Sequence, residues 1–397
     1  MNKLSDRINA LSESETIAMA RRSRELIAKG IDVINLSLGE PDFSTPDVIK
    51  QAAKKAIDEN FSYYTHVSGY LELRQAIVKK FKRDNNLNFS AEQIVVSTGA
   101  KQSIANAVLA LINPGDEVIV PAPYWVSYIE IIKLAGGVAV IIPTSLEDDF
   151  KLNPEQLKKA ITPKTRLFIY STPCNPTGSV YTKQELQELG NVLATKEDLY
   201  IISDEIYEHI NFSGKHESMA QFANVSDKVI TINGLSKGFA MTGWRVGFMA
   251  APLWIAKACD KMQGQFTSAT CSIAQKAAQA AVEMDPSTTW EMRDAFKRRR
   301  DLLLELLKQI PGMKVNIPKG AFYVFPEVTY YFGKKVDETI INNASELCMY
   351  LLEKANVAVV PGDAFGAPDY IRIAYATSEI KLEQAVSRIK TALEKLT

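Results

Sequence analysis

The sequence predicts an α/β protein built on a central, mostly parallel β-sheet with helices on both faces. Short apolar runs alternate with helical patterns along the middle of the chain. These runs are apolar throughout, which is typical of strands buried on both faces of a parallel sheet. The chain has 397 residues, more than a single hydrophobic core usually supports, so a second and smaller domain is expected.

The first elements of the sheet are expected to be three strands and a helix. The run at 94–97 leads through a small, glycine-bearing turn into residues 101–112, which have helical spacing. The run at 117–120 follows a Pro-Gly-Asp turn at 114–116, and the run at 138–142 is β-branched and apolar. Each of these apolar runs therefore predicts a strand.

Two helices of the second half have recognisable N-termini. Asn153 and Pro154 have the residue types that favour an N-cap and the first helical position. Thr182 with Glu185 forms a capping box, and the helix that it opens is expected to end near Ala194. The remaining strands are expected at three apolar runs: 167–170, 199–203 and 229–232.

The two ends of the chain differ from its middle. Both ends carry long helical patterns, and the C-terminal end adds the segments 321–325 and 371–375. We therefore expect residues 1–45 and 291–397 to combine into a small α+β domain. The large domain, which would contain the sheet and its ligand-binding site, is expected at 46–290.

Composition argues against several classes of protein. The chain has 46 Lys plus Arg and 46 Asp plus Glu, so no net field attracts nucleic acid or an anionic membrane. Its N-terminus does not resemble a signal peptide, and no apolar run is long enough to span a bilayer. The cysteines show no metal-ligand or Cys-x-x-Cys spacing, so a reducing compartment and a cytoplasmic protein are expected: Cys174, Cys259, Cys271 and Cys348.

Lys237 is the most informative single residue. It follows the apolar run at 229–232 and precedes Arg245 within a glycine-rich segment. A lysine near apolar and cationic groups has a lowered pKa and can form a Schiff base with a carbonyl. Pyridoxal phosphate uses such a lysine, and its phosphate requires a nearby cation. The alternative is a solvated surface lysine, which most lysines are.

Four further motifs each follow an expected strand, where binding sites of such sheets lie. The loop at 97–103 opens a helix and suits a phosphate. Asn175 lies between two prolines, and its amide suits a phenolic or carboxylate oxygen. Asp204 precedes Tyr207 by three residues, and an aspartate keeps a pyridine nitrogen protonated. Trp125 suits a flat ring. The ordinary alternatives are turns, an N-cap aspartate and a buried core tryptophan.

Taken together, these motifs resemble the signature set of fold-type I, class I aminotransferases. The similarity covers nearly the whole chain, from 39–43 to 370–373. The segments 123–128 and 241–245 are especially similar to the bacterial aspartate aminotransferase branch, subgroup Ib. The residues that carry the resemblance keep the order and spacing of that family: Asn175-Pro176-x-Gly178, Asp204-x-x-Tyr207, and Lys237 with Arg245.

The resemblance implies pyridoxal 5′-phosphate as cofactor, with Lys237 as Schiff-base lysine and as proton shuttle between the substrate Cα and the cofactor C4′. It implies that Asp204 pairs with the pyridine nitrogen and that Trp125 stacks on the ring. It further implies that Tyr207 and Asn175 bond the phenolic oxygen, and that the phosphate is held by Arg245, Ser236 and the amides of Ala100 and Lys101. Tyr64 would reach the phosphate of the neighbouring subunit's cofactor, so a homodimer with shared sites is implied.

The resemblance also implies a set of substrate-binding residues: Gly39, Lys101, Trp125, Asn175, Arg372, Ser14 and Thr16. Gly39 and Arg372 would take the α-carboxylate, the arginine through its bidentate geometry. Lys101 would meet the distal carboxylate of aspartate or glutamate. The alternative is that Lys101 only neutralises the cofactor phosphate.

Two features qualify the resemblance. Gly234 stands where several relatives carry a serine for the phosphate, so part of the phosphate binding must come from elsewhere. None of the histidines lies at a catalytic position of the motifs, which leaves Lys237 as the candidate base: His66, His209 and His216. No metal site is expected.

The expected activity is transfer of an amino group from aspartate or glutamate to a 2-oxo acid such as 2-oxoglutarate, by a ping-pong route. Within the same branch, a prephenate or aromatic aminotransferase is an alternative. A carbon–sulfur β-lyase, a cyclopropane-forming synthase and a non-enzymatic regulator are alternatives from other classes. Trp125 and Lys101 favour transfer, and an intact Lys237 opposes the regulator.

Overall fold

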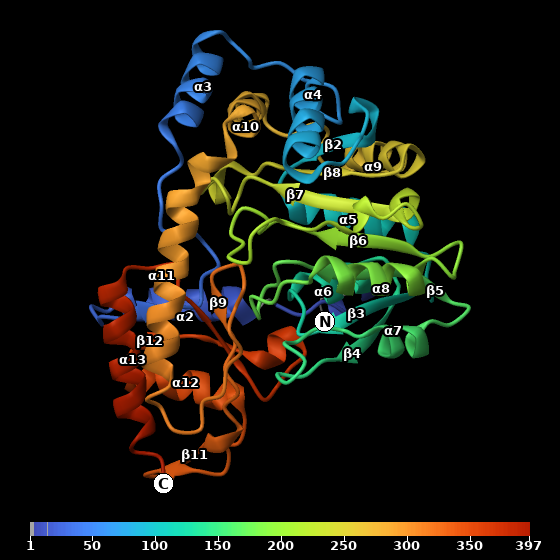
Figure 1. The fold of residues 1–397 in the computed structure, drawn as a ribbon. Helices are drawn as coiled ribbons and strands as arrows, with labels where there is room; N and C mark the ends of the chain where they lie inside the picture. Colours follow the sequence, from blue (N-terminus) through green and yellow to red (C-terminus); the bar gives the residue numbers. More distant parts are fainter. Residues whose placement is uncertain (1–3, 14) are drawn as a thin grey trace.

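The computed structural model describes residues 4–13 and 15–397 and is organised around a seven-stranded sheet (Figure 1). All neighbouring strands are parallel except that β8 is antiparallel to β2 and to β7. The mostly parallel sheet predicted from the sequence is confirmed. Across the sheet the strands are β2 (Ile94–Ser97), β8 (Gly247–Ala250), β7 (Val229–Gly234), β6 (Tyr200–Asp204), β5 (Thr165–Ser171), β3 (Glu117–Ala122) and β4 (Val138–Pro143).

Alternate residues of each strand enter two different hydrophobic cores. On β3, Val118 and Val120 belong to one core while Ile119 belongs to the other. Since successive side chains of a strand point to opposite faces, both faces of the sheet must be covered. The first core contains α5 (Ala100–Leu111), α6 (Ser127–Leu134) and α9 (Leu253–Phe266). The second contains α3 (Asp47–Asp58), α4 (Leu71–Lys80), α7 (Pro154–Ala160), α8 (Lys183–Leu193) and α10 (Ser272–Glu283).

The helix N-termini that the sequence predicted are confirmed. The Asn153 side chain accepts a hydrogen bond from the Gln156 amide, and Pro154 is the first residue of α7. Thr182 and Glu185 bond reciprocally at the start of α8. These side chains satisfy amide groups that have no partner within the helix, which is why they mark its start.

Segments from both ends of the chain form a second body beside the sheet, drawn in blue and in orange to red in Figure 1. β1 (Ile34–Asn35) pairs in parallel with β12 (Val357–Ala358). β14 (Ile371–Ala374) lies between β13 (Val360–Pro361) and β9 (Tyr323–Val324), antiparallel to both. The helices here are α2 (Glu15–Ala28), α11 (Trp290–Leu307), α12 (Ala344–Lys354) and α13 (Glu379–Leu393), and the described residues also include α1 (Asp6–Asn9), β10 (Lys335–Val336) and β11 (Thr339–Ile340).

One core joins the two ends of the chain. It contains Met19 and Leu36 together with Leu303 and Ile373. The expected combination of both termini therefore has a physical basis in shared apolar burial. The domain boundaries at 45/46 and 290/291 stay a prediction.

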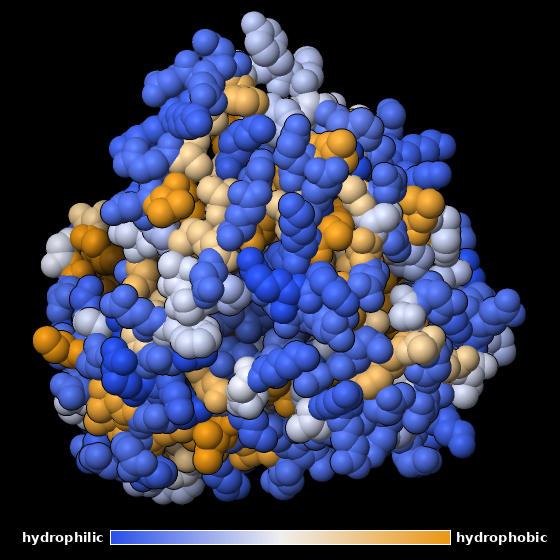
Figure 2. Space-filling model, turned by 45° about the horizontal axis from the view of Figure 1, so that its top comes forward, coloured by the Kyte–Doolittle hydropathy of each residue, from blue (hydrophilic) through white to orange (hydrophobic). Residues whose placement is uncertain are grey.

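The face shown in Figure 2 is mainly hydrophilic, with hydrophobic residues in separate areas. Among the residues that the structure describes, no helix is both long and apolar enough to cross a membrane.

Candidate active site

One cavity lies where the strands of the main sheet end. β2 and β7 are both antiparallel to β8, so they run in the same direction as the other strands of the sheet. The loops that follow the strands therefore meet at one edge, as expected for a sheet of this kind. The cavity is lined by eleven of the predicted site residues: Gly39, Ala100, Lys101, Trp125, Asn175, Asp204, Tyr207, Ser236, Lys237, Arg245 and Arg372.

Three predicted site residues are not placed in this cavity. Tyr64 is 98% exposed and does not line it. Ser14 and the side chain of Thr16 lie outside the described part of the structure. Ile17, one residue later in α2, does line the cavity. The N-terminal segment therefore approaches the site as expected, while the contacts of Ser14 and Thr16 stay a prediction.

Lys237 follows β7 and projects into the cavity, where its ammonium donates to the Gly39 carbonyl at 2.5 Å. Burial lowers the pKa of Lys237 to about 8; the carboxylates of Glu40 and Asp204 oppose the shift and the Arg372 guanidinium adds to it. A lysine with this pKa carries an appreciable fraction of neutral amine near neutral pH, so it can act as nucleophile and as base.

Asp204 ends β6 at the base of the cavity and is only 5% exposed. Its Oδ2 accepts a hydrogen bond of 2.7 Å from the Tyr128 hydroxyl, and its Oδ1 accepts one of 3.3 Å from the Ile206 amide. Burial raises the pKa of Asp204 to about 6, against the effect of these two hydrogen bonds. The group is therefore mostly a carboxylate at neutral pH.

One end of the cavity carries the positive charge of Arg245. Gly99 is the N-cap of α5 and has φ of 86°, and a Cβ on this residue would lie 2.3 Å from Arg245 Nη2. Glycine therefore lets the guanidinium approach the helix N-terminus, where the Ala100 and Lys101 amides begin α5. Backbone amides and a guanidinium at such a terminus suit a phosphate.

Lys101 and Trp125 lie together on the wall of the cavity. The Lys101 ammonium is 5.1 Å from the centroid of the indole. Partial desolvation in the cavity lowers the pKa of Lys101, and the positive charge of Arg245 adds to the effect. The Lys101 side chain nevertheless reaches solvent through the open cavity. It is thus a cation that a substrate can reach.

The structure gives a reason for Gly234. This residue ends β7 opposite Gly247 of β8. A Cβ on Gly234 would lie 3.0 Å from the Gly247 Cα and 3.2 Å from the Val246 carbonyl. A side chain here would require the neighbouring backbone to shift slightly, so glycine suits this close pairing of the two strands.

Arg372 and Asn175 are bonded to each other across the cavity. Arg372 Nη1 donates to Asn175 Oδ1 at 3.0 Å, and Nη2 donates to the Ser37 carbonyl at 2.6 Å. The arginine is 2% exposed, and its Nε has no partner within the described part of the chain. Burying a cation with an unsatisfied donor is costly unless an anion joins it. This arrangement suits a carboxylate ligand.

Sequence reasoning missed two tyrosines that line the same cavity. Tyr323 exchanges a hydrogen bond of 2.7 Å with the Tyr207 hydroxyl, and its ring lies 4.6 Å from the Arg372 guanidinium. Tyr128 is the donor to Asp204. Tyr128 lies in the segment 123–128 and Tyr323 in the segment 321–325, and neither segment carries a local signal of contacts with residues far away along the chain.

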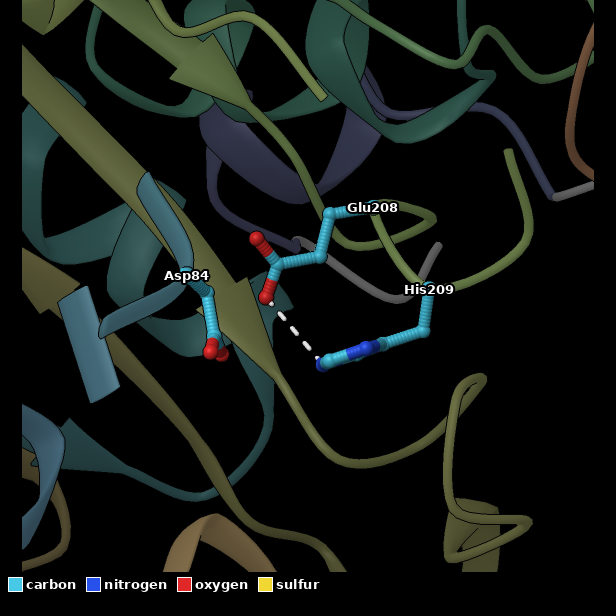
Figure 3. Close-up of side chains that lie close together, drawn as sticks. All are labelled: Asp84, Glu208 and His209. Atoms are coloured by element: carbon cyan, nitrogen blue, oxygen red, sulfur yellow. Dashed lines mark ion pairs between the residues drawn. The ribbon is translucent and has the colours of Figure 1, made fainter. Parts of the chain in front are cut away.

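A separate charged cluster lies outside the cavity and joins Asp84, Glu208 and His209 (Figure 3). Their ligand-type atoms lie within 4.8 Å of one another. The Lys80 ammonium contacts Glu208 directly and lies 3.8 Å from Asp84, so a lysine already supplies the cation. Burial raises the pKa of Glu208, but Lys80 and His209 outweigh it and hold that pKa well below its usual range.

The histidines, all three of which the structure describes, do not line the cavity. His209 lies 3.2 Å from Glu208, and His216 lies 2.9 Å from Glu205. His66 bonds Ser68 in a loop. Lys237 is therefore the basic side chain best placed to move a proton at the centre of the site.

The groups in the cavity fit pyridoxal phosphate. A buried carboxylate suits its ring nitrogen, the Tyr207 hydroxyl and the Asn175 amide suit its phenolic oxygen, and the cationic end at Arg245 suits its phosphate. Lys237 lies among the same lining residues and suits its aldehyde.

Comparison with known proteins is consistent with a site for pyridoxal phosphate. Residues 31–389 match the family described as aminotransferase class I and II. The aspartate/prephenate aminotransferase of Nitrosomonas europaea is 46% identical, over 98% of this chain and 100% of that protein. A bifunctional aspartate aminotransferase and glutamate/aspartate-prephenate aminotransferase of Petunia hybrida is 48% identical, over 98% of this chain and 82% of that protein.

Solved structures give the same result. The aspartate aminotransferase from Rhizobium meliloti superimposes with a TM-score of 0.96 at 39% identity, covering 100% of both chains. The aspartate aminotransferase from Thermus thermophilus with maleate superimposes with a TM-score of 0.93 at 40% identity, covering 99% of this chain and 100% of that one. These likenesses confirm the fold-type I architecture expected from the sequence.

Proposed function

This chain belongs to the class I and II aminotransferases, and from that premise we propose that it moves an amino group from aspartate or glutamate to a 2-oxo acid such as 2-oxoglutarate. It is an enzyme of the aspartate aminotransferase type that depends on pyridoxal phosphate. The observation that carries the substrate proposal is the presence of Arg372 and Lys101 in the cavity that contains Lys237. Two cations beside one reactive amine suit an amino acid with two carboxylates.

Each residue has a separate task in the proposed mechanism. When bound, pyridoxal phosphate supplies an aldehyde that takes up the amino group and a ring that withdraws electrons from the Cα–H bond. Lys237 Nζ, as a neutral amine, would take the proton from the substrate Cα and would hold it for return within the site. Asp204 would hold a proton on the ring nitrogen, and Trp125 would pack against the ring. Arg372 binds the α-carboxylate and so orients the Cα–H bond toward Lys237.

We propose that Lys101 binds the distal carboxylate of the substrate. Its ammonium reaches solvent through the cavity, and Arg245 already supplies charge at the phosphate end. The Thermus thermophilus relative, 40% identical, was solved with maleate, a dicarboxylate. That ligand supports a site with two carboxylate-binding groups.

Lys101→Ala should weaken the half-reaction with acidic amino acids selectively. Losing a hydrogen bond to a charged group costs about 1.5–3 kcal/mol, so conversion by aspartate and glutamate should fall about 10- to 100-fold. Conversion by alanine and phenylalanine should change little. The measurement is the absorbance change from the pyridoxal to the pyridoxamine form after mixing with each amino acid.

Lys133→Ala serves as a control for Lys101→Ala, since Lys133 pairs with Glu130 outside the cavity. An equal loss with all four amino acids would assign Lys101 to the phosphate instead. Rapid conversion of native protein by phenylalanine or alanine alone would refute the acidic-substrate proposal. Release of a thiol instead of a keto acid would favour the β-lyase.

Prephenate is a second candidate acceptor. The relative from Nitrosomonas europaea is named an aspartate/prephenate aminotransferase. Prephenate also carries a distal carboxylate, so the same pair of cations suits it. Adding prephenate or 2-oxoglutarate to the pyridoxamine form compares the two acceptors directly.

We propose a cytoplasmic homodimer in which Tyr64 of each subunit completes the site of the other. Tyr64 and Tyr63 are largely exposed, as is Phe266 at the end of α9. The segment that contains Tyr63 and Tyr64 is held to the rest of the protein, because Gln275 donates to the Thr65 hydroxyl at 3.1 Å. Exposed aromatic residues on a fixed segment suit a subunit interface. Sedimentation equilibrium should give twice the chain mass, and a fully active monomer would contradict the proposal.

A further inference from the structure

Tyr128 connects two groups of the cavity, Asp204 at the end of β6 and Trp125 in the loop that follows β3. It is the second residue of α6, and its side chain is almost completely buried. Its hydroxyl donates to Asp204 Oδ2 at 2.7 Å. Its ring meets the indole of Trp125 edge to face, with centroids 5.4 Å apart and an interplanar angle of 83°. One side chain thus contacts both the carboxylate and the indole.

We propose that Tyr128 is a positioning residue, which fixes the Asp204 carboxylate in one orientation and keeps it ionised while its ring holds the Trp125 indole in place. The proposal rests on the proposed function, because it concerns how these two side chains are presented to pyridoxal phosphate. In this proposal Tyr128 acts through Asp204, and its role does not require direct contact with the cofactor.

The hydrogen bond restricts the carboxylate because few other groups reach it. Asp204 has one bond on each oxygen, and that from the Ile206 amide is the longer, at 3.3 Å. Without the Tyr128 hydroxyl, Oδ2 would lose its donor in a buried place. The carboxylate would then be free to rotate about its side-chain torsions, and its charged form would be less stable.

Tyr128 is suited to remain a donor. Burial raises the pKa of its phenol well above the usual range, and the neighbouring Asp204 carboxylate adds to that effect. The phenol therefore keeps its proton at any pH at which the enzyme would work. Burial also raises the pKa of Asp204 to about 6, and the hydrogen bond from Tyr128 is the largest effect that opposes it. Removing that hydroxyl should move the pKa of Asp204 further toward neutrality.

Tyr128→Phe tests the proposal because it removes only the hydroxyl and keeps the ring. The affinity of the apoenzyme for pyridoxal phosphate should fall about tenfold, the typical effect of one hydrogen bond to a charged group. The loss should be larger near about pH 6.5 than near about pH 8.5, because the Asp204 carboxyl takes up a proton as the pH falls. In steady state, kcat with aspartate should fall while KM stays within about twofold, because Arg372 is untouched.

A matched control and a double-mutant cycle separate positioning from a general loss of packing. Tyr350→Phe removes another buried hydroxyl, which donates to the Ala392 carbonyl at 2.8 Å outside the cavity, and should leave cofactor affinity unchanged. In an Asp204→Ala background, Tyr128→Phe should have no further effect on affinity. Tyr128→His, which keeps a ring N–H donor, should recover part of the affinity.

The outcomes distinguish this proposal from the proposed function. An equal loss of affinity in the Asp204→Ala background, or unchanged affinity and kcat in Tyr128→Phe, would overturn the role of Tyr128. Either result would leave transamination by the native enzyme intact. Failure of the native enzyme to convert any amino acid would instead refute the proposed function.

Discussion

Replacing Lys237 by alanine is expected to abolish transamination while leaving a folded protein. The substitution removes the amine that forms the Schiff base and the base that moves the Cα proton. Loss of a general base alone typically costs about 10²–10⁴-fold in rate. The half-reaction with aspartate, followed by absorbance, should therefore slow by at least about 10³-fold.

The folded state of Lys237→Ala can be judged from thermal unfolding of the apoenzyme. The pKa of Lys237 in the folded protein is about 8, below the ordinary value of 10.5. The folded state therefore binds fewer protons than the unfolded state between these values, and stability rises with pH across that window. At neutral pH the buried ammonium is a net cost, so the alanine variant should melt no lower than the native protein.

The same pKa predicts how the native apoenzyme captures its cofactor. The neutral fraction of Lys237 increases as the pH rises through about 8, so capture should accelerate across that range. The alanine variant should show no such capture. Near-normal turnover by Lys237→Ala would refute the mechanism.

Arg372→Ala should lower kcat/KM for every amino-acid substrate by about 10²- to 5 × 10³-fold. The guanidinium is buried, and Asn175 and Ser37 fix its orientation. Removing one partner of a buried charge pair costs about 3–5 kcal/mol, which corresponds to that loss. Steady-state kinetics with aspartate, glutamate and alanine provide the measurement.

The pattern across substrates separates the two cations. Arg372→Ala should affect all three amino acids alike because every one of them has an α-carboxylate. Lys101→Ala should affect only the acidic ones. Arg372→Lys should also be impaired, because an ammonium lacks the two-pronged geometry. Arg166→Ala is a control, since Arg166 pairs with Asp198 away from the cavity. Unchanged kcat/KM in Arg372→Ala would contradict the assignment of the α-carboxylate site.

Local signals in the sequence predicted most of the sheet and several helix ends. The Asn153 and Thr182 caps were predictable because each depends on residues within three positions. Strand β8, at Gly247–Ala250, was not among the expected strands. It is four residues long and directly follows a glycine-rich loop, so its extended conformation depends on pairing with β2 and β7.

Residue types and spacing alone were enough to indicate a pyridoxal-phosphate site centred on Lys237. The chemistry of that site requires particular side chains just after particular strands, and both features can be read along a chain. Tertiary structure alone decided which other side chains complete it. Tyr128 meets Asp204 and Tyr323 meets Tyr207 across 76 and 116 residues of sequence. Such contacts, and the burial that shifts the pKa values of Lys237 and Asp204, arise only when distant segments pack together.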